Sequence, residues 1–276
     1  MKHYTCGSTD ITIKFNNSNG KIINYKGVIL LMPQINISGI KINYNDKHDI
    51  AAIVENYFFD VYNINNIKHG DYVVDLGAGI GDFSMLASQR AEKVFAIEPN
   101  PRDYNSLLEN IKMNNINNII PINMAVSDKI EVLKLKFKND FFDTKAAPLK
   151  EILNEYKMDF TKLKFMKMDI EGYERKVIPD NIDIIKSLNY LAMEIHDNYF
   201  TELNSLMKKY GFKFCRITRN IYIKNSIKRF IQSPISSLKI YKLIKNADEY
   251  PGMKKILNGI EISKSNNLVV GTFKKY

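Results

Sequence analysis

The sequence predicts an α/β protein built on a mostly parallel, doubly wound sheet. Three observations predict it. Strand and helix patterns alternate from residue 72 onward, a glycine-rich turn follows the first buried strand, and the expected strands end in polar or acidic residues. Such alternation requires parallel strands joined by crossover helices. Ligands of these sheets bind outside the carboxyl ends of the strands, so a site is expected there.

The composition is ordinary for a soluble globular protein, and its charge is basic. The 276 residues are 45% hydrophobic and 25% charged, with a formal net charge of +10. This excess of positive charge favours acidic partners, although a general richness in lysine explains the charge equally well. The two cysteines have no metal-ligand spacing, and no apolar run is long enough for a signal peptide core or a membrane span. We expect a cytoplasmic protein without a transmembrane segment.

The elements are expected in the following order. Short apolar runs separated by turn signals predict a β-rich N-terminal lobe over 1–49, ahead of one domain over 50–276. Apolar residues at helical spacing predict a helix over 50–65, and further helices are expected over 82–90, 101–115 and 198–210. Strands are expected over 72–76, 93–99, 118–126, 163–170, 188–196, 212–218 and 267–273, the last two pairing antiparallel at the sheet edge.

A basic helical insertion is expected over 219–264, between the last two strands. It holds ten basic and three acidic residues, and so carries most of the formal excess of positive charge. Its position suggests a lid over the cleft or a surface for a phosphorylated or lipid-linked ligand near a membrane. A solvated helical face explains the same pattern.

The stretch "VVDLGAGIGDFS", residues 73–84, places glycines at alternate positions 77, 79 and 81. A dinucleotide fingerprint would need a glycine at position 82, where Asp82 would repel a pyrophosphate. No Gly-Lys-Ser/Thr follows, which excludes a P-loop. The pattern therefore favours an adenosine ligand without phosphate, and S-adenosylmethionine is the common one. Asp75 is expected near its ammonium group, and Glu98, at the end of the next strand, is expected to accept both ribose hydroxyls.

Five motifs in order resemble the FkbM family of class I S-adenosylmethionine-dependent methyltransferases: "VVDLGAGIGDFS", "AIEPNP", "NMAVSD", "KMDIEGYE" and "MEIH". The resemblance covers about residues 50–215, and "KMDIEGYE" (167–174) discriminates best. It implies a seven-stranded Rossmann-like sheet with an antiparallel last strand, and O-methylation of sugars or other small hydroxyl compounds. The cofactor-binding residues expected on these motifs are Asp75, Gly77, Ala78, Gly79, Gly81, Glu98, Pro99, Asn100, Ala125 and Val126. Tyr57 is added from the preceding helix, which commonly borders the S-adenosylmethionine carboxylate in this fold, although core packing is the alternative.

The candidate catalytic residues follow the fourth and fifth strands. Asp169 and Glu171 come after the fourth strand, and Glu194 and His196, two apart on the fifth, point to one face. A hydroxyl needs a base or a metal to act as a nucleophile, so His196 is the expected base. A divalent cation held by Asp169 with Glu194 or His196 is the rival mechanism. The alternative is structural: His196 caps the strand end, and the acids bind backbone amides.

Neighbouring polar residues are expected to be structural. Glu174 and Arg175 are expected on a solvated helix, Arg102 and Lys167 on the surface, and Tyr62 in the core. The expected activity is methyl transfer to a hydroxyl of a sugar, a glycan or another small molecule, including anionic or lipid-linked ones. An RNA methyltransferase is the alternative, and a non-catalytic binding protein is a third reading. Nucleic acid is considered an unlikely partner because "DIEGYE" stands where a base-methylating enzyme would carry an Asn-Pro-Pro-Tyr-like motif.

Overall fold

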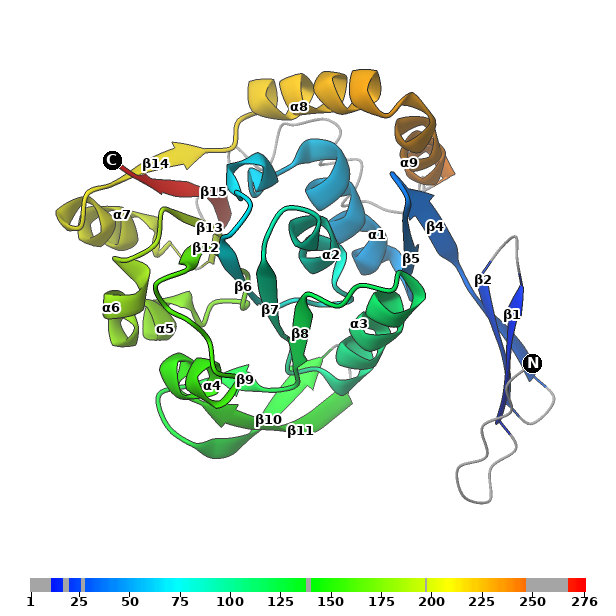
Figure 1. The fold of residues 1–276 in the computed structure, drawn as a ribbon, viewed down its shortest axis with the longest axis horizontal. Coiled ribbons are helices and arrows are strands. Elements are labelled where there is room, and N and C mark those ends of the chain that lie inside the picture. The colour runs from blue at the N-terminus through cyan, green and yellow to red at the C-terminus, as the bar shows by residue number, and fades with distance from the viewer. Residues whose placement is uncertain (1–10, 17–19, 26–27, 138–139, 197, 247–267) are drawn as a thin grey trace.

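The computed structural model describes residues 11–16, 20–25, 28–137, 140–196, 198–246 and 268–276. Its centre is a seven-stranded sheet in the order β14-β15-β13-β12-β6-β7-β8 (Figure 1). The strands are β6 (Tyr72–Leu76), β7 (Lys93–Ile97), β8 (Ile119–Ile122), β12 (Leu163–Met168), β13 (Tyr190–His196), β14 (Phe212–Arg216) and β15 (Leu268–Lys275).

The direction of these strands confirms the predicted fold class. Five strands run parallel to one another: β6, β7, β8, β12 and β13. β15 is antiparallel to both β13 and β14. A seven-stranded, mostly parallel sheet with a reversed last strand is the class I methyltransferase arrangement. The chain reverses its winding between β6 and β12, so the carboxyl ends of these two strands and β7 border the crevice where ligands bind.

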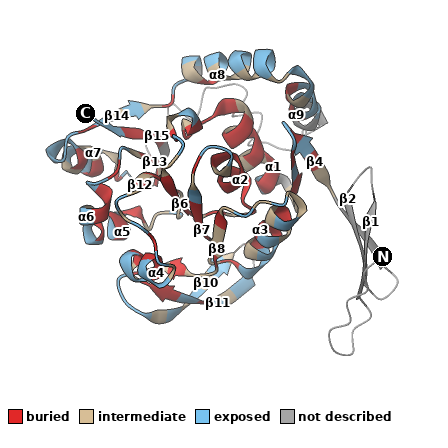
Figure 2. Ribbon diagram, viewed as in Figure 1, coloured by how far each residue is buried: buried red, intermediate tan, exposed pale blue. Residues whose placement is uncertain are grey.

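Helices cover both faces of the sheet because its central strands are apolar on both sides. Val73 and Val74 are each fully buried, on opposite faces. One face carries α1 (Lys47–Ile53), the π-helical η1 (Val54–Phe59), α2 (Asp82–Ser88) and α3 (Pro101–Met113). The other carries α4 (Leu149–Glu155), α5 (Glu174–Asp180), α6 (Ile182–Ile185) and α7 (Phe200–Lys209). Figure 2 shows the buried residues concentrated in the strands and along the inner sides of these helices.

The helix expected over 50–65 ends earlier, at Asp60. This residue has a left-handed backbone (φ 49°), and its carboxylate accepts hydrogen bonds from the Ile64 amide (2.7 Å) and from Asn65 (2.8 Å). These bonds favour a turn over continued helix. A short 3₁₀ helix, η2 (Ile64–Asn66), then leads into β6.

The strand expected over 118–126 is divided into β8 and β9 (Ala125–Val126). Asn123 lies between the two, and its side chain donates to the carbonyls of Glu98 (2.8 Å) and Pro99 (3.3 Å). β9 then pairs with a hairpin formed by β10 (Glu131–Phe137) and β11 (Asp140–Ala147), which lies outside the central sheet (Figure 1). The sequence pattern does not predict this hairpin.

Five strands precede the helices. β1 (Ile11–Asn16), β2 (Gly20–Tyr25) and β3 (Val28–Met32) form an antiparallel sheet that projects from the rest of the chain (Figure 1). β4 (Gln34–Ile37) and β5 (Ile40–Asn43) form a hairpin held to α3, where Asn110 accepts from the Asn43 amide at 2.8 Å. The division into domains at residue 49 stays a prediction.

The basic segment begins with α8 (Arg219–Gln232) and α9 (Pro234–Asn246). The remainder of the expected insertion, 247–264, lies outside the described residues. Within the described part of the chain, no helix is long and apolar enough to cross a membrane.

Candidate active site

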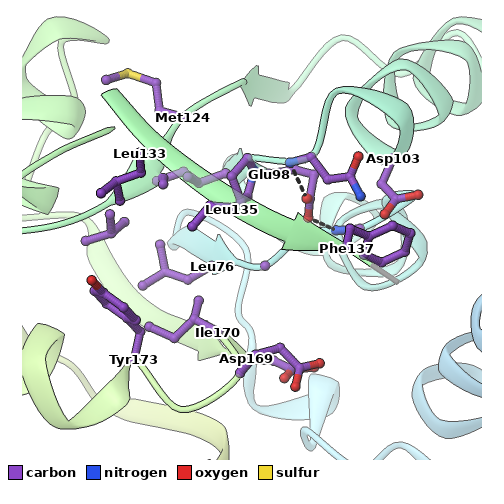
Figure 3. Close-up of a pocket in the computed structure, with 18 of the residues that line it drawn as sticks. Leu76, Glu98, Asp103, Met124, Leu133, Leu135, Phe137, Asp169, Ile170 and Tyr173 are labelled. Atoms are coloured by element: carbon purple, nitrogen blue, oxygen red, sulfur yellow. Dashed lines mark hydrogen bonds between the residues drawn. The ribbon is translucent and has the colours of Figure 1, made fainter. Parts of the chain in front are cut away.

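A cavity of about 390 Å³ opens at the carboxyl ends of β6, β7 and β12. Its size lies within the range of small-molecule sites. Seven of the residues predicted to bind a cofactor line it: Gly77, Gly79, Glu98, Pro99, Asn100, Ala125 and Val126. Figure 3 shows Leu133, Leu135 and Phe137 of the β10–β11 hairpin across the cavity from Ile170 and Tyr173, which follow β12. The fold thus brings the glycine loop, the end of β7 and an apolar wall around one space.

The glycine loop is shaped by two close approaches. A Cβ at Gly77 would lie 1.9 Å from the Asp169 carbonyl oxygen, and one at Gly81 would lie 2.3 Å from a Leu107 methyl group. A larger residue at 77 would separate the loop from β12, and one at 81 would separate α2 from α3. Gly79 has no atom that such a Cβ would meet, and its positive φ (54°) turns its amide toward Glu98.

Glu98 is the best-defined polar group of the cavity. Its carboxylate is buried and accepts hydrogen bonds from the amides of Gly79 (2.7 Å) and Asn100 (2.8 Å). Burial outweighs these bonds and raises the pKa of Glu98 to about 7. Each carboxylate oxygen has a further lone pair, so both can accept a hydroxyl group. This geometry fits the role expected for Glu98 toward a ribose.

Four other predicted cofactor residues, Tyr57, Asp75, Ala78 and Gly81, do not line the cavity. Asp75 is fully buried under the loop, where Ser84 donates to it at 2.6 Å and the Lys167 ammonium lies 3.3 Å away. It therefore supports the loop instead of facing a ligand's ammonium group. Tyr57 is buried beneath α8, with the Arg229 guanidinium 5.1 Å from its ring centre.

Lys167 is buried, contrary to the surface position expected from the sequence. Its ammonium donates to the Gly77 carbonyl at 2.6 Å and lies 4.0 Å from Asp169. Burial alone would lower the pKa of Lys167, but the carboxylates of Asp75 and Asp169 raise it overall. The charged ammonium thus ties the glycine loop to β12 and offsets part of the negative charge around it.

Asp169, Glu194 and His196 converge as the sequence predicts. One ligand atom from each lies within 4.8 Å of the others. The Tyr62 hydroxyl lies 3.4 Å from a carboxylate oxygen of Asp169 and 3.4 Å from one of Glu194, so this tyrosine does more than fill the core. Burial, followed by repulsion from Asp169 and Glu55, raises the pKa of Glu194 well above its usual value.

Glu55 adds a further carboxylate, which no motif in the sequence indicates. Burial, followed by the charges of Asp169 and Asp82, raises its pKa to about 8. Burial also raises the pKa of Asp82 to about 6, although Asn56 donates to it at 2.6 Å. At neutral pH this cluster therefore holds a proton or a cation more readily than separated carboxylates would.

His196 is oriented by Glu174, which was expected to be solvated. Glu174 is 1% exposed, and its carboxylate lies 3.2 Å from His196 Nδ1 while accepting from the amides of Ile170 and Gly172 at 3.3 Å. This hydrogen bond raises the pKa of His196 against the opposing effect of burial. Nε2 faces Glu171 and Glu194, at 3.9 and 4.0 Å. Glu171 itself is exposed at the rim.

The cluster also has the composition of a metal site. Two carboxylates and one imidazole suit a divalent transition metal, and a cation would neutralise the like charges that raise the pKa values of Glu55 and Glu194. Asp169 and Glu171 belong to the wall of the cavity. A base or a metal in this cluster would therefore lie beside a ligand in the cavity.

Comparison with known proteins identifies similarity to enzymes that modify tRNA. Residues 61–141 match the model of the TRM5/TYW2 methyltransferase domain. The chain is 46% identical over 65 residues to the tRNA (guanine(37)-N(1))-methyltransferase Trm5b of Pyrococcus abyssi, which covers 24% of this chain and 19% of that protein. It is 30% identical over 152 residues to the tRNA (guanine(37)-N(1))-methyltransferase of Candida albicans, and this match covers 54% of this chain and 32% of that protein.

A third relative carries out a different transfer. The tRNA(Phe) (4-demethylwyosine(37)-C(7)) aminocarboxypropyltransferase of Methanocaldococcus jannaschii is 54% identical over 57 residues, covering 20% of this chain and 23% of that protein. The chain thus spans a third or less of the length of each of these relatives.

These findings correct two expectations. The assignment to the FkbM family is wrong, because the matching model is that of the TRM5/TYW2 domain. The misleading motif, 167–174, lies outside the matched residues and supplies Lys167 and Glu174, which support the loop and His196. The view that nucleic acid is an unlikely partner is also wrong, because the relatives are named for reactions on tRNA. The chain combines the class I methyltransferase fold with a segment similar in sequence to the TRM5/TYW2 methyltransferase domain.

Proposed function

We propose that this protein transfers a methyl group from S-adenosylmethionine to a base of tRNA. The observation that carries the proposal is the match over 61–141, because this segment contains the glycine loop, Glu98 and most of the hairpin over the cavity. The net charge of +10 suits a polyanionic acceptor. A tRNA base thus takes the place of the sugar or glycan hydroxyl that was expected as the methyl acceptor. The proposal implies that the protein acts in the cytoplasm.

The cavity suits the donor in three ways. Glu98 offers acceptors for the ribose hydroxyls, and Val126, Leu133 and Leu135 offer an apolar slot for the adenine. Gly79 leaves open space for close approach of the methionine portion. When bound, the donor would supply an electrophilic carbon next to a sulfonium, and the protein's task is to place a nucleophile in line with it.

The acceptor would enter beside Asp169. Carboxylates accept hydrogen bonds, and a guanine-type base presents N–H donors, so Asp169 and Glu194 could fix such a base at the end of β12 and β13. A ring nitrogen must lose its proton when it is alkylated. We assign that proton to His196 Nε2, because Glu174 holds the opposite ring nitrogen and Glu171 extends from the rim.

A divalent cation held by Asp169, Glu194 and His196 is the alternative way to position the acceptor. The two mechanisms differ in a simple measurement. Extensive treatment with EDTA would abolish transfer if the cation is needed, and added Mn²⁺ or Mg²⁺ would restore it. With His196 as base, transfer would persist in EDTA and increase with pH through the titration of His196.

Transfer of the aminocarboxypropyl group is a second candidate, favoured by the 54% identity to the Methanocaldococcus jannaschii aminocarboxypropyltransferase. The same donor carries both groups on its sulfonium. The reaction then depends on which carbon the site aligns with the nucleophile, so the two activities require different positions of the acceptor relative to Asp169.

The test uses unmodified tRNA transcripts and two donors, one labelled in the methyl group and one in the carboxyl group. We expect methyl label to enter the tRNA, and Asp169→Asn to lower the rate by roughly 100-fold. The matched control is Asp183→Asn, an exposed residue of α6, which should retain the rate. Carboxyl label in the tRNA would establish the second candidate. Binding of S-adenosylhomocysteine without transfer of either label would refute an RNA acceptor.

A further inference from the structure

The helices α8 and α9 expose large apolar side chains, and the surface that these side chains form is called here the apolar face. The residues of α8 recur at helical spacing and so form a single stripe. Their exposed fractions, and those of the α9 residues, range from 47% to 74%. They are Ile223, Ile227, Phe230, Ile231, Ile235, Leu238 and Tyr241. Among the described residues they make up seven of the thirteen large hydrophobic side chains that are exposed, so this apolar surface is concentrated in one place.

The fold does not need these side chains for its own packing. α8 is anchored by buried Tyr222 and by Asn225, which donates to the Phe59 carbonyl at 2.7 Å. α9 is anchored by Ser237 and Ile240, both fully buried. Figure 1 shows α8 along the outer edge of the molecule, and Figure 2 shows exposed residues along its length. The apolar face therefore points away from the core.

The charged residues of α8 and α9 have one sign. Residues 219–246 contain seven lysines and arginines and no aspartate or glutamate. Lys224 and Lys228 of α8 and Lys239 and Lys242 of α9 are exposed. A helix pair with apolar side chains and a purely basic flank is complementary to a surface that is apolar inside and anionic outside.

We infer that α8 and α9 bind the surface of an anionic lipid bilayer. The helices have 14 and 13 residues, too short to span it, so they would lie in the plane of the interface with the apolar face inserted among the acyl chains. Tyr241 can keep its hydroxyl at the headgroups. The lysines would contact the lipid phosphates. The inference does not depend on the proposed transfer to tRNA.

Two other occupants fit less well. RNA would satisfy the lysines, but the exposed isoleucines and Leu238 cannot stack on bases as aromatic rings do. A second copy of the chain would satisfy the apolar side chains, but a two-fold interface would bring two sets of lysines together without a carboxylate from the described helices between them. A bilayer with anionic headgroups satisfies both features.

The test is co-sedimentation of the purified protein with vesicles of phosphatidylcholine alone or with 30% phosphatidylglycerol. We expect binding to the anionic vesicles, weakened by high salt and at least tenfold stronger than to the neutral ones. The double variant Ile231→Ser/Ile235→Ser should lose at least tenfold in affinity, and Lys224→Gln/Lys228→Gln should lose the preference for phosphatidylglycerol.

Two controls separate this effect from loss of folding or of general charge. Ile130→Ser changes an equally exposed isoleucine elsewhere, and Lys208→Gln/Lys209→Gln removes two exposed lysines of α7; both should bind vesicles as the unchanged protein does. Thermal melting and binding of S-adenosylhomocysteine verify the fold of each variant. Equal sedimentation of all variants, or no binding to either vesicle, would overturn the inference. The inference would also be overturned if Ile231→Ser/Ile235→Ser abolished a dimer seen in light scattering, or abolished tRNA binding, while the variant still bound vesicles.

Discussion

At Glu98, burial raises the pKa of the same carboxylate that we propose binds the ribose of the donor. Its pKa of about 7 means that the free site holds a mixture of protonated and ionised forms at neutral pH. If ribose hydroxyls donate to the ionised form, as proposed, binding of S-adenosylhomocysteine should weaken as the pH falls below 7, by about tenfold per pH unit. Calorimetric titration between pH 5.5 and 8.5 measures this slope.

The variant Glu98→Gln should bind S-adenosylhomocysteine weakly at every pH, and its affinity should no longer depend on pH. The control is Glu92→Gln, at a surface ion pair with Lys162, which should keep both the affinity and its pH dependence. An unchanged pH dependence in Glu98→Gln would assign the titration to another group.

The pairing of Glu174 with His196 leads to a prediction about the pH profile. The hydrogen bond that His196 Nδ1 makes to the Glu174 carboxylate is the main cause of the raised pKa of His196, so Glu174→Gln should lower this pKa. If His196 accepts the proton, the rise of the transfer rate with pH should move to lower pH by the same amount. The histidine resonances in NMR and the rate profile give the two values. Glu202→Gln, on neighbouring α7, is the control, and a rate profile that does not follow the NMR pKa would exclude His196 as the base.

These residues also show where the sequence stops being informative about the site. Asp169, Glu194 and His196 could be predicted to meet because strand ends of a parallel sheet share one edge. The roles of Lys167 and Glu174 could not, because their positions depend on groups that the chain brings from elsewhere, such as the Gly77 carbonyl. A charged residue is exposed by default, and only the folded neighbours reveal the exception.

Among the elements, the strands of the sheet were predictable and the β10–β11 hairpin was not. Central parallel strands are continuous apolar runs, whereas β10 alternates lysines with apolar residues and thereby hides its role as a wall of the cavity. This alternation divides β10 into two faces. Leu135 lines the cavity, and Val132 is exposed on the opposite face.

The two faces of β10 predict opposite results for similar truncations. Leu135→Ala would remove the apolar contact that we propose for the adenine and should weaken binding of S-adenosylhomocysteine by about fivefold. Val132→Ala, three residues earlier on the outer face, should leave the affinity unchanged. Calorimetry measures both, with thermal melting to verify folding. Equal affinities for the two variants would mean that the hairpin does not contact the ligand.

Across the whole molecule, the acidic cluster couples the stability of the fold to pH. Glu55 titrates near pH 8 in the folded protein and near 4.5 when unfolded, so its contribution is fully present at low pH and is lost as the pH rises through about 8. The melting temperature should therefore fall between about pH 4.5 and 8, and Glu55 should cause no further fall above that range. Glu55→Gln removes one carboxylate from beside Asp169 and Asp82, so it should reduce this fall.

At pH 8.5, with EDTA present, Glu55→Gln should melt about 2–4 °C above the unchanged protein, since roughly 1 kcal/mol corresponds to such a shift in a protein of this size. At pH 5, where Glu55 is largely protonated, the advantage should vanish. Glu151→Gln, on the surface of α4, should melt like the unchanged protein at both pH values. This result would show that the repulsion between the carboxylates of the cluster destabilises the fold. Such repulsion is expected in a site that receives a proton or a cation during its reaction. A melting temperature that Glu55→Gln lowers at pH 8.5 would show instead that the charged carboxylate supports the fold.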